Sequence, residues 1–323
     1  MQAEYNISII TVNFNGYRDT AALIESIPRD ARIELIVVDN GSRQNEAELL
    51  QSRYPHITAL RSDENLGFAG GNNLGIRASH GQYLFFVNND TVLEVESGEW
   101  KEERGERRAN SSVFQPLIDR LESDPQIGAV CPKIRFAWAD HPIQFAGYTP
   151  LSRITLRNAA IGFGEKDLGQ HDAPHPTPYA HGAAMMVKRE AIERARLMPE
   201  CFFLYYEELD WSLMLRRAGY SIWYEPLFTI YHKESQSTGQ GSALRSYYIT
   251  RNRLLFARRN QPLSVRYLTY LYLLCLVTPR DVVNHLVHHQ LDLASATFAG
   301  VRDFLLNRQN KRLAPFKTKP TSR

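Results

Sequence analysis

Asp90 is the residue of this chain whose surroundings most directly suggest chemistry. It follows an apolar run at residues 83–87 and the two amides Asn88 and Asn89. Such a run is typical of a buried strand, and in open parallel sheets ligands bind beyond the carboxyl ends of the strands. A carboxylate there suits Mg²⁺ or Mn²⁺ carrying phosphates, because these ions prefer oxygen ligands and take few carboxylates from the protein. Asn and Asp are also turn residues, so a plain turn is the alternative.

Two polar residues upstream of Asp90 also end apolar runs. Asn13 closes one run within residues 7–15, and Asp39 closes another within 33–42. If these runs are parallel strands, the three side chains lie along one edge of the sheet, where a ligand is expected. The segment NLGFAGGNNLGI at 65–76 adds a helix N-terminus to that edge, which suits phosphate or ribose oxygens. It lacks GxGxxG spacing, which disfavours a dinucleotide site.

Short apolar runs alternate with helical patterns through the first 90 residues. The expected strands are 7–15, 33–42, 57–63 and 83–90, and the expected helices are 20–27, 46–54 and 69–80. Strands and helices alternating at this spacing predict parallel βαβ units. The predicted fold class is therefore α/β, with a Rossmann-like, doubly wound, mostly parallel sheet.

A second acidic group lies at Glu207, Glu208 and Asp210, between the aromatic run 202–206 and an amphipathic helix. One carboxylate there could take a proton from a hydroxyl while its oxygen attacks an electrophile. The sequence does not choose between Glu208 and Asp210 as that base. An ordinary helix start is the alternative, because acidic residues are favoured in a first turn.

These segments together resemble a known family. TVNFNG (11–16), VVDNGS (37–42), ENLGFAGGNNLGI (64–76) and FVNND (86–90) resemble the nucleotide-sugar half of family 2 glycosyltransferases with the GT-A fold. FFLYYEELDWSLMLRRAGY (202–220) resembles that family's acceptor-side motif, usually Glu-Asp-x-Asp followed by an Arg-containing helix. The resemblance implies a metal-dependent, inverting hexosyltransferase of surface polysaccharide synthesis. Its implied donor is a nucleotide-diphosphate sugar, such as dTDP-L-rhamnose, and its implied acceptor is a glycan or lipid-linked glycan.

The resemblance also assigns roles to individual residues. Glu208 stands where the family carries its base, with Asp210 left open, and Asn88 stands where the family has the first Asp of its Asp-x-Asp motif. Asp90 and His232 are the implied ligands of Mg²⁺ or Mn²⁺. The implied donor-binding residues are Asn13, Asp39, Asn65, Gly67, Asn73 and Asn89. The implied acceptor-binding residues are His181 and Gly182, and Trp211 could stack on a sugar ring.

Composition and charge suggest three regions. Residues 1–130 form the expected nucleotide-sugar half, interrupted by a charged, flexible insertion at 94–112, and residues 131–242 form the acceptor and base half. Residues 243–323 form an expected helical region with a net charge of +11, against −8 for the rest of the chain. Such a split favours contact with an anionic surface.

The C-terminal region favours a membrane over nucleic acid as that surface. Its apolar stretch from Tyr267 to Val277 is too short to span a bilayer but suits a helix at the interface. Tyr267, Tyr270, Tyr272, Leu273 and Leu274 are the expected contacts at the headgroup level. The N-terminus lacks a signal-peptide pattern, and three cysteines give neither a disulfide framework nor a metal cluster. We therefore expect a cytoplasmic protein, peripheral at the inner face of the cytoplasmic membrane.

Two other functions remain open from the sequence. A sugar-phosphate nucleotidyltransferase would need a Gly-rich N-terminal loop bearing Arg and Lys, which this chain lacks. A non-catalytic nucleotide- or glycan-binding module is suggested by Asn88 and Glu208, which replace family acids. Release of nucleoside diphosphate from nucleotide sugars separates these possibilities.

Overall fold

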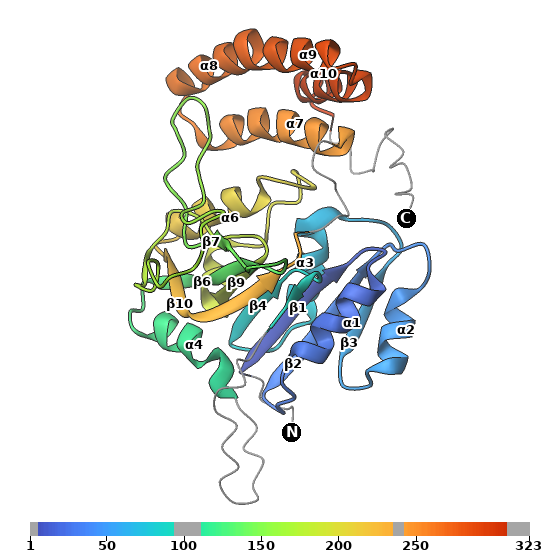
Figure 1. The fold of residues 1–323 in the computed structure, drawn as a ribbon, viewed down its shortest axis with the longest axis vertical. Helices are drawn as coiled ribbons and strands as arrows, with labels where there is room; N and C mark the ends of the chain where they lie inside the picture. Colours follow the sequence, from blue (N-terminus) through green and yellow to red (C-terminus); the bar gives the residue numbers. More distant parts are fainter. Residues whose placement is uncertain (1–5, 94–110, 235–241, 309–323) are drawn as a thin grey trace, which may run out of the picture.

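The computed structural model describes residues 6–93, 111–234 and 242–308 (Figure 1). Most of the predicted insertion, 94–110, lies outside these residues. The strands are β1 (Ile7–Asn13), β2 (Ile33–Asn40), β3 (Thr58–Ser62), β4 (Tyr83–Val87), β5 (Thr91–Val92), β6 (Ile127–Phe136), β7 (Ile143–Phe145), β8 (His175–Pro176), β9 (Ala184–Lys188) and β10 (Ser221–His232).

The helices begin and end as follows. In the first half lie α1 (Tyr17–Ser26), α2 (Glu46–Arg53), α3 (Gly67–Ala78), the 3₁₀ helix η2 (Ser111–Phe114) and α4 (Gln115–Glu122). The second half holds α5 (Arg189–Ala195), α6 (Glu207–Arg217), α7 (Ala243–Asn260), α8 (Leu263–Tyr272), the π-helical turn η3 (Leu273–Val277), α9 (Thr278–Val287) and α10 (Leu291–Leu305). The strands and helices predicted within the first 90 residues are all present, with ends displaced by a few residues.

Within the described residues one mixed sheet runs through the molecule in the order β3-β2-β1-β4-β9-β6-β10-β5. The pairs β2–β3, β1–β2, β1–β4 and β6–β10 are parallel, so the carboxyl ends of these strands meet at one edge. Strand β9 is antiparallel to both β4 and β6, so the loop that precedes β9 reaches the same edge. The predicted boundary at residue 130 falls inside β6, and the sheet is continuous across it.

The sheet curves so that its last strands, β10 and β5, lie close to the end of β4. Strand β5 pairs with the end of β10, through Thr91 and His232, yet only residues 88–90 separate β5 from β4. Three residues span about 10 Å at most. The register of β10 against β6 shifts between Glu225 and Thr229, and such irregularities bend a strand. The sheet therefore curls until the end of β10 lies beside the end of β4.

The core is built from the fully apolar strand β4 and from helices packed on the sheet. Phe85 and Phe86 are buried, and Phe86 meets the ring of Trp211 edge to face at 5.5 Å. Helices α1, α2 and α3 contact β1, β2 and β3, while α4 packs against β6 and β10. This packing fixes the strand ends that carry the candidate site.

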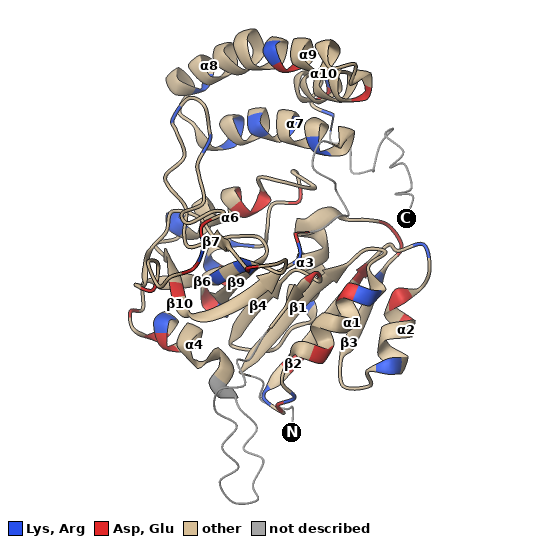
Figure 2. Cartoon of the chain, viewed as in Figure 1, with Lys and Arg blue, Asp and Glu red and all other residues tan. Residues whose placement is uncertain are grey.

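The C-terminal helices form a separate layer, with α7 between the sheet domain and the α8 to α9 segment (Figure 1). Helices α8, η3 and α9 follow one another without a break, and α10 packs against α7 and α9. Figure 2 shows basic residues along α7. No described helix is both long and apolar enough to cross a membrane.

The α8 to α9 segment exposes an apolar stripe to solvent. Its members recur at helical spacing and are Tyr267, Leu268, Leu271, Leu276, Val283, Leu286 and Val287. Of the five residues expected to contact headgroups, only Tyr267 belongs to this stripe, with 66% of its surface exposed. Leu273 is buried, and Tyr270, Tyr272 and Leu274 are partly buried against the core. The π-helical turn at 273–277 shifts the outward face relative to an unbroken α-helix, which sequence periodicity did not anticipate.

Candidate functional site

The candidate site lies at the edge where the parallel strands end. Asn13 ends β1, Asp39 stands one residue before the end of β2, and His232 ends β10. Asp90 lies in the short connection between β4 and β5. The three polar strand ends predicted from the sequence therefore do meet, and the curl of the sheet adds His232 to them.

Asp90 and His232 form a buried pair. His232 Nε2 lies 3.1 Å from Asp90 Oδ1, and both residues are at most 6% exposed. On the other side of the ring, His232 Nδ1 lies 2.8 Å from Gln144 Oε1 in β7. An amide oxygen can only accept, so Nδ1 carries a proton, and in the neutral ring the lone pair of Nε2 points toward Asp90.

This pair has unused capacity to bind a cation. Asp90 Oδ2 is buried and has no hydrogen-bond partner among the described residues. A buried carboxylate oxygen without a donor is costly. A divalent cation would satisfy Asp90 Oδ2. Nowhere in the described chain do three or more His, Cys, Asp or Glu side chains gather as a complete metal site, so phosphate and water oxygens would supply the remaining ligands.

Asn13 and Asp39 are held mainly by the protein itself. Asn13 is fully buried, and its amide donates to Glu46 Oε2 at 2.7 Å. Asp39 accepts from Arg61 Nη1 at 2.8 Å and from the backbone N–H groups of Ser42, Glu46 and Ala47. The four donors occupy its carboxylate and tie the turn after β2 to the start of α2. Both residues thus stabilise the edge of the sheet where the parallel strands end. To contact a ligand directly, Asp39 would have to give up one of its four hydrogen bonds.

Of the other residues expected to bind the sugar donor, two lie at this edge of the sheet and two offer no side chain to a ligand. Asn65 and Asn89 are partly exposed at the edge; Asn65 Oδ1 accepts from Gly67 N at 2.8 Å, and Asn89 donates to Thr20. The Asn73 amide is occupied by the backbone of Met198: its Nδ2 donates to the Met198 carbonyl, and its Oδ1 accepts from the Met198 N–H. Gly67 has a φ of +75°, and a Cβ there would lie 2.2 Å from the Phe203 carbonyl oxygen. Neither Asn73 nor Gly67 offers a side chain to a ligand.

Glu208 in the first turn of α6 is a carboxylate poised to accept a proton. Burial raises the pKa of Glu208 to about 7. The neighbouring Glu207 is more deeply buried, with an unpaired Oε2, and burial together with the charge of Glu208 raises its pKa well above the ordinary value. Glu207 therefore holds its proton more firmly than an ordinary carboxyl group does, and Glu208 exchanges its proton near neutral pH.

The side chains of Asp210 and Trp211 are buried and bonded to other parts of the protein. Asp210 is buried and accepts from the Arg259 guanidinium at 2.9 Å and from the Asn260 amide, both at the end of α7. Its carboxylate is thus neutralised and occupied, which favours Glu208 over Asp210 as a base. Trp211 is fully buried and donates its indole N–H to the Arg196 carbonyl. It has no exposed surface on which a sugar could stack, so that expectation is wrong; the aromatic ring serves the core.

His181 and Gly182 lie beside Glu208. A Cβ on Gly182 would lie 3.8 Å from Phe68 Cζ and 3.9 Å from Glu208 Cγ, which are ordinary contact distances, so Gly182 is a direct neighbour of the Glu208 side chain. The Ala183 N–H donates to His181 Nδ1 at 3.1 Å, which leaves the proton of the neutral ring on Nε2. Burial and the nearby His232 lower the pKa of His181 to about 3, so the ring is neutral.

The loop before β9 connects the two parts of the site. The Asn88 N–H donates to the Ala183 carbonyl at 2.9 Å, while the adjacent Gly182 borders Glu208. The Asp90 pair and the Glu208 carboxylate are therefore neighbours across one short segment. The structure brings together Asn88, Asp90, His181, Gly182, Glu208 and His232.

Sequence reasoning missed Gln144 and Tyr148. Gln144 is buried and orients the His232 ring, and Tyr148 stacks on His181 with ring centroids 5.8 Å apart. Burial and the charge of Glu208 raise the pKa of Tyr148, so its hydroxyl stays protonated. Neither residue stands in a recognisable motif, because both reach the site only through the pairing of β7 with β6 and its following loop.

Comparison with protein-family models gives one match. The model described as glycosyl transferase family 2 matches residues 8–97, which run from β1 past the connection carrying Asp90.

Two curated relatives cover most of the chain. The low-salt glycan biosynthesis hexosyltransferase Agl10 of Haloferax volcanii is 27% identical over 315 residues, covering 95% of this chain and 93% of the relative. The N-acetylglucosaminyl-diphospho-decaprenol L-rhamnosyltransferase of Mycobacterium tuberculosis is 24% identical over 232 residues, covering 68% of this chain and 72% of the relative.

Two solved structures share the architecture. The mannosyltransferase PcManGT from Pyrobaculum calidifontis, in complex with GDP-Man and Mn²⁺, superposes with a TM-score of 0.54 over 95% of this chain and 89% of its own. GalNAc-T7 with UDP, GalNAc and Mn²⁺ superposes with a TM-score of 0.56 over 83% of this chain and 54% of its own. Both are 14% identical in sequence, so these likenesses establish the fold alone.

Proposed function

Residues 8–97 belong to glycosyltransferase family 2 within a chain of GT-A fold, and on that premise we propose an inverting transfer of a sugar from a nucleotide-diphosphate donor to an acceptor hydroxyl. One observation carries the proposal. The cation-binding pair Asp90–His232 and the carboxylate of Glu208 lie on either side of the single segment 181–183. A donor diphosphate held at the pair would present its sugar toward the carboxylate.

The residues at the donor edge fit a divalent cation, Mg²⁺ or Mn²⁺. Asp90 Oδ2 and His232 Nε2 are the atoms that would hold it, and Gln144 fixes the ring that carries Nε2. When bound, the cation compensates the charge of the departing diphosphate. Both solved neighbours were determined with Mn²⁺, which supports this assignment.

Glu208 is the proposed base. Its carboxylate takes the proton of the acceptor hydroxyl while that oxygen forms a bond to the anomeric carbon and the bond from this carbon to the diphosphate oxygen breaks. A pKa of about 7 suits the role, because a general base is most effective when its pKa lies near the working pH. Asp210, bound to Arg259, serves to hold the start of α6.

Acceptor binding is assigned to the space beside Gly182. Glu208, His181 and Gly182 are all partly exposed, and His181 can donate from Nε2 to a sugar oxygen. Donor-side contacts are assigned to the edge at Asn65 and Asn89, with Asn13 and Asp39 shaping its floor.

The names of the relatives support a hexosyl donor and a lipid-linked acceptor. One relative is called a hexosyltransferase of glycan biosynthesis and the other an L-rhamnosyltransferase acting on a diphospho-decaprenol. We infer dTDP-L-rhamnose as the first donor to test. The experiment is release of nucleoside diphosphate from a panel of nucleotide sugars, with and without Mn²⁺ and a polyprenyl-diphosphate glycan. No release with any donor would favour a non-catalytic binding module instead.

The exposed stripe on α8 and α9 supports attachment to the surface of an anionic membrane. Tyr267, Leu271 and Val287 are each more than 60% exposed, and burial of such apolar area is the main force that holds an interfacial helix. Arg266 precedes the stripe, and Arg280, which pairs with Asp281, lies within its length; both suit anionic headgroups. A lipid-linked acceptor lies in such a membrane, so the attachment would bring the enzyme to its substrate.

A further inference from the structure

The segment just before α6, residues 201–206, has an unusual backbone. Phe203, Tyr205 and Tyr206 all have positive φ angles, of 70°, 67° and 77°. Residues with a side chain rarely adopt this left-handed conformation, and it persists only where the surroundings hold it. Because Glu208 follows two residues after this segment, whatever holds the segment also sets the position of that carboxylate.

Asn252 of α7 holds most of the segment. Its Nδ2 lies within hydrogen-bond distance of three carbonyl oxygens: Phe202 at 2.9 Å, Leu204 at 2.7 Å and Tyr205 at 2.9 Å. Its Oδ1 accepts from Arg251 Nη1 at 2.7 Å. The carbonyls can only accept and the guanidinium can only donate, so the orientation of this fully buried amide is determined by its partners.

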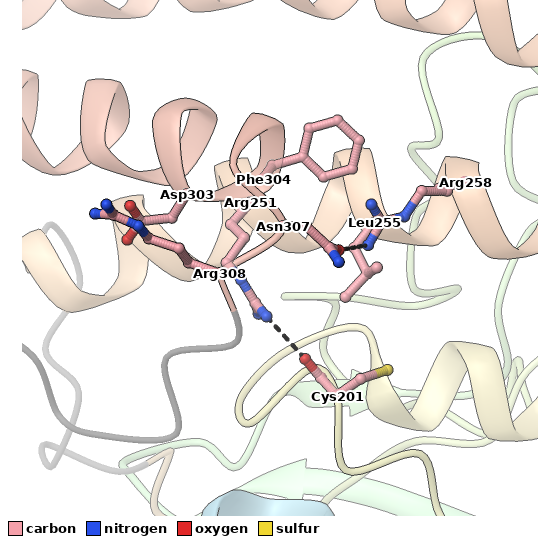
Figure 3. A pocket seen from close by; sticks show the side chains of 8 residues that line it. All are labelled: Cys201, Arg251, Leu255, Arg258, Asp303, Phe304, Asn307 and Arg308. Atoms are coloured by element: carbon pink, nitrogen blue, oxygen red, sulfur yellow. Dashed lines mark hydrogen bonds between the residues drawn. The ribbon is translucent and has the colours of Figure 1, made fainter.

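Arg251 and helix α3 hold the remaining carbonyls. Arg251 Nη2 donates to the Cys201 carbonyl at 3.0 Å, a bond seen in Figure 3, and Nη1 lies 3.3 Å from the Phe202 carbonyl. The Phe203 carbonyl accepts from the N–H of Phe68 at 2.9 Å. Every carbonyl from 201 to 205 thus has a donor from outside the segment, four of them from two consecutive residues of α7.

The end of α7 holds the other side of Glu208. Asp210, two residues beyond the base, is bound by the Arg259 guanidinium and the Asn260 amide. Helix α7 therefore binds the chain on both sides of Glu208. Asn252 bonds the segment before it, and Asn260, eight residues later in α7, bonds Asp210 after it. None of these α7 residues touches the proposed substrate positions.

We propose that Asn252 of α7 is a positioning residue for Glu208. The proposal rests on the proposed function, in which Glu208 is the base. Removal of the Asn252 amide takes the donor from the Leu204 and Tyr205 carbonyls and leaves the Phe202 carbonyl with Arg251 alone. The left-handed segment then relaxes and displaces the carboxylate from the acceptor hydroxyl. The hydrogen bonds of Asn252 go to Phe202, Leu204, Tyr205 and Arg251, and not to the edge that carries Asp90 and His232, so the affinity for the nucleotide is expected to be kept.

The test compares variants of the full chain in three measurements: the dissociation constant for nucleoside diphosphate with Mn²⁺, kcat, and amide hydrogen exchange of peptides covering 201–212. In Asn252→Ala we expect kcat to fall about 10- to 100-fold, since a displacement of about 1 Å can cost that much. Nucleotide affinity should stay within about twofold, and exchange over 201–212 should quicken. Asn252→Gln, which keeps the amide on a longer arm, should restore part of kcat.

Arg258→Gln is the matched control. Arg258 lies on the same helix, but its guanidinium is exposed and bonds Asn307 of the chain after α10 at 3.0 Å (Figure 3). This variant should leave kcat and exchange over 201–212 unchanged. An equal loss in Arg258→Gln, or a kcat in Asn252→Ala close to wild type, overturns the proposal. If Asn252→Ala does not fold, Asn252→Gln decides: slower turnover with faster local exchange supports the proposal, and wild-type values for both overturn it.

Failure of the proposed function has a different signature. If Glu208→Gln turns over normally, Glu208 is not the base and Asn252 cannot position one. Exchange over 201–212 in the Asn252 variants would still report whether the amide holds the segment. The structural and the catalytic parts of the proposal are therefore tested separately.

Discussion

His232 Nε2 lies 3.1 Å from Asp90 Oδ1, although 142 positions separate the two residues in the sequence. The contact exists because β5 pairs with the end of β10, which carries His232 to the connection after β4. It leaves Asp90 Oδ2 buried and without a partner among the described residues. The first two predictions follow from this pair.

Asp90→Asn should abolish metal-dependent turnover while the fold is kept. The amide cannot compensate the charge of a divalent cation, so the loss should be about 100-fold or more. Turnover across a Mn²⁺ titration and the melting temperature are the measurements. Asp19→Asn is the control, because Asp19 is a partly exposed acid that pairs with Lys233, next to His232. Near-normal activity of the Asp90 variant would mean that the metal lies elsewhere.

Gln144→Leu should weaken the metal site without removing a ligand. Gln144 accepts the His232 Nδ1 proton and so fixes which nitrogen faces Asp90. Loss of such an orienting partner typically costs about 10- to 100-fold in metal affinity. Mn²⁺ binding in the presence of nucleoside diphosphate should show this shift, with kcat largely recovered at saturating Mn²⁺. An unchanged Mn²⁺ affinity would argue against His232 as a ligand.

Glu208→Gln should reduce turnover by about 100-fold or more with nucleotide binding intact, because the amide keeps the shape of the base but cannot accept a proton. Glu207→Gln is the matched comparison. Burial and the charge of Glu208 raise the pKa of Glu207 well above its ordinary value, which makes Glu207 the poorer base, so its amide variant should retain most activity. The opposite ranking of the two variants would assign the base to Glu207.

The pH dependence follows from the raised pKa of Glu208. The base works only when ionised, so kcat/KM for the acceptor should rise with pH through about 7. Stability should change in the opposite sense. Burial favours the protonated form, so the free energy of unfolding is unaffected below the ordinary pKa of 4.5 and declines as the pH rises through about 7. Glu208→Gln should therefore gain melting temperature relative to wild type at pH 8 but not at pH 4.5. No such gain would contradict the raised pKa.

Membrane attachment should depend on the stripe of α8 and α9. Liposomes containing anionic lipid should capture the full chain in flotation at low salt, and Leu268→Glu with Leu271→Glu should prevent capture. Leu227→Glu is the control, because Leu227 is 77% exposed but lies in β10. High salt should release part of the protein, since the Debye length falls to about 3 Å at 1 M. Equal capture of the stripe variant would refute the docking surface.

The sequence predicted the donor half of the fold well. Alternating apolar runs and helical patterns located β1 to β4 and α1 to α3, because in a βαβ unit local periodicity and tertiary packing agree. The meeting of Asn13, Asp39 and Asp90 at one edge followed from the same rule. The resemblance supplied His232, which local pattern alone could not bring to Asp90.

The roles of individual polar residues were less predictable. Asp39 and Asn73 have the residue types of ligand contacts, yet their partners are backbone groups and the side chains of Arg61 and Glu200. Asn252 was overlooked because it stands in an ordinary helical pattern, and only the fold brings it to the 201–206 segment. Part of the expected membrane charge is also used internally: Arg251, Arg253 and Arg259 of α7 bind the catalytic domain. The sequence shows which residues are polar, but only their burial and hydrogen-bond partners in the fold show whether they can bind a ligand.

The order of strands in the sheet also limits how this protein could be recombined with its relatives. Strand β9 belongs to the half after residue 130 and lies between β4 and β6, whereas β5 belongs to the half before residue 130 and pairs with β10 at the opposite edge of the sheet. The two halves are interlaced, so a chimera joined at residue 130 would have to match the β4–β9 register from Tyr83 against Lys188 to Val87 against Ala184. Exchange of acceptor specificity is more practical through the loops that leave the sheet. A lineage that changes its glycan would accordingly be expected to retain these strand pairs and to diversify the segments between them.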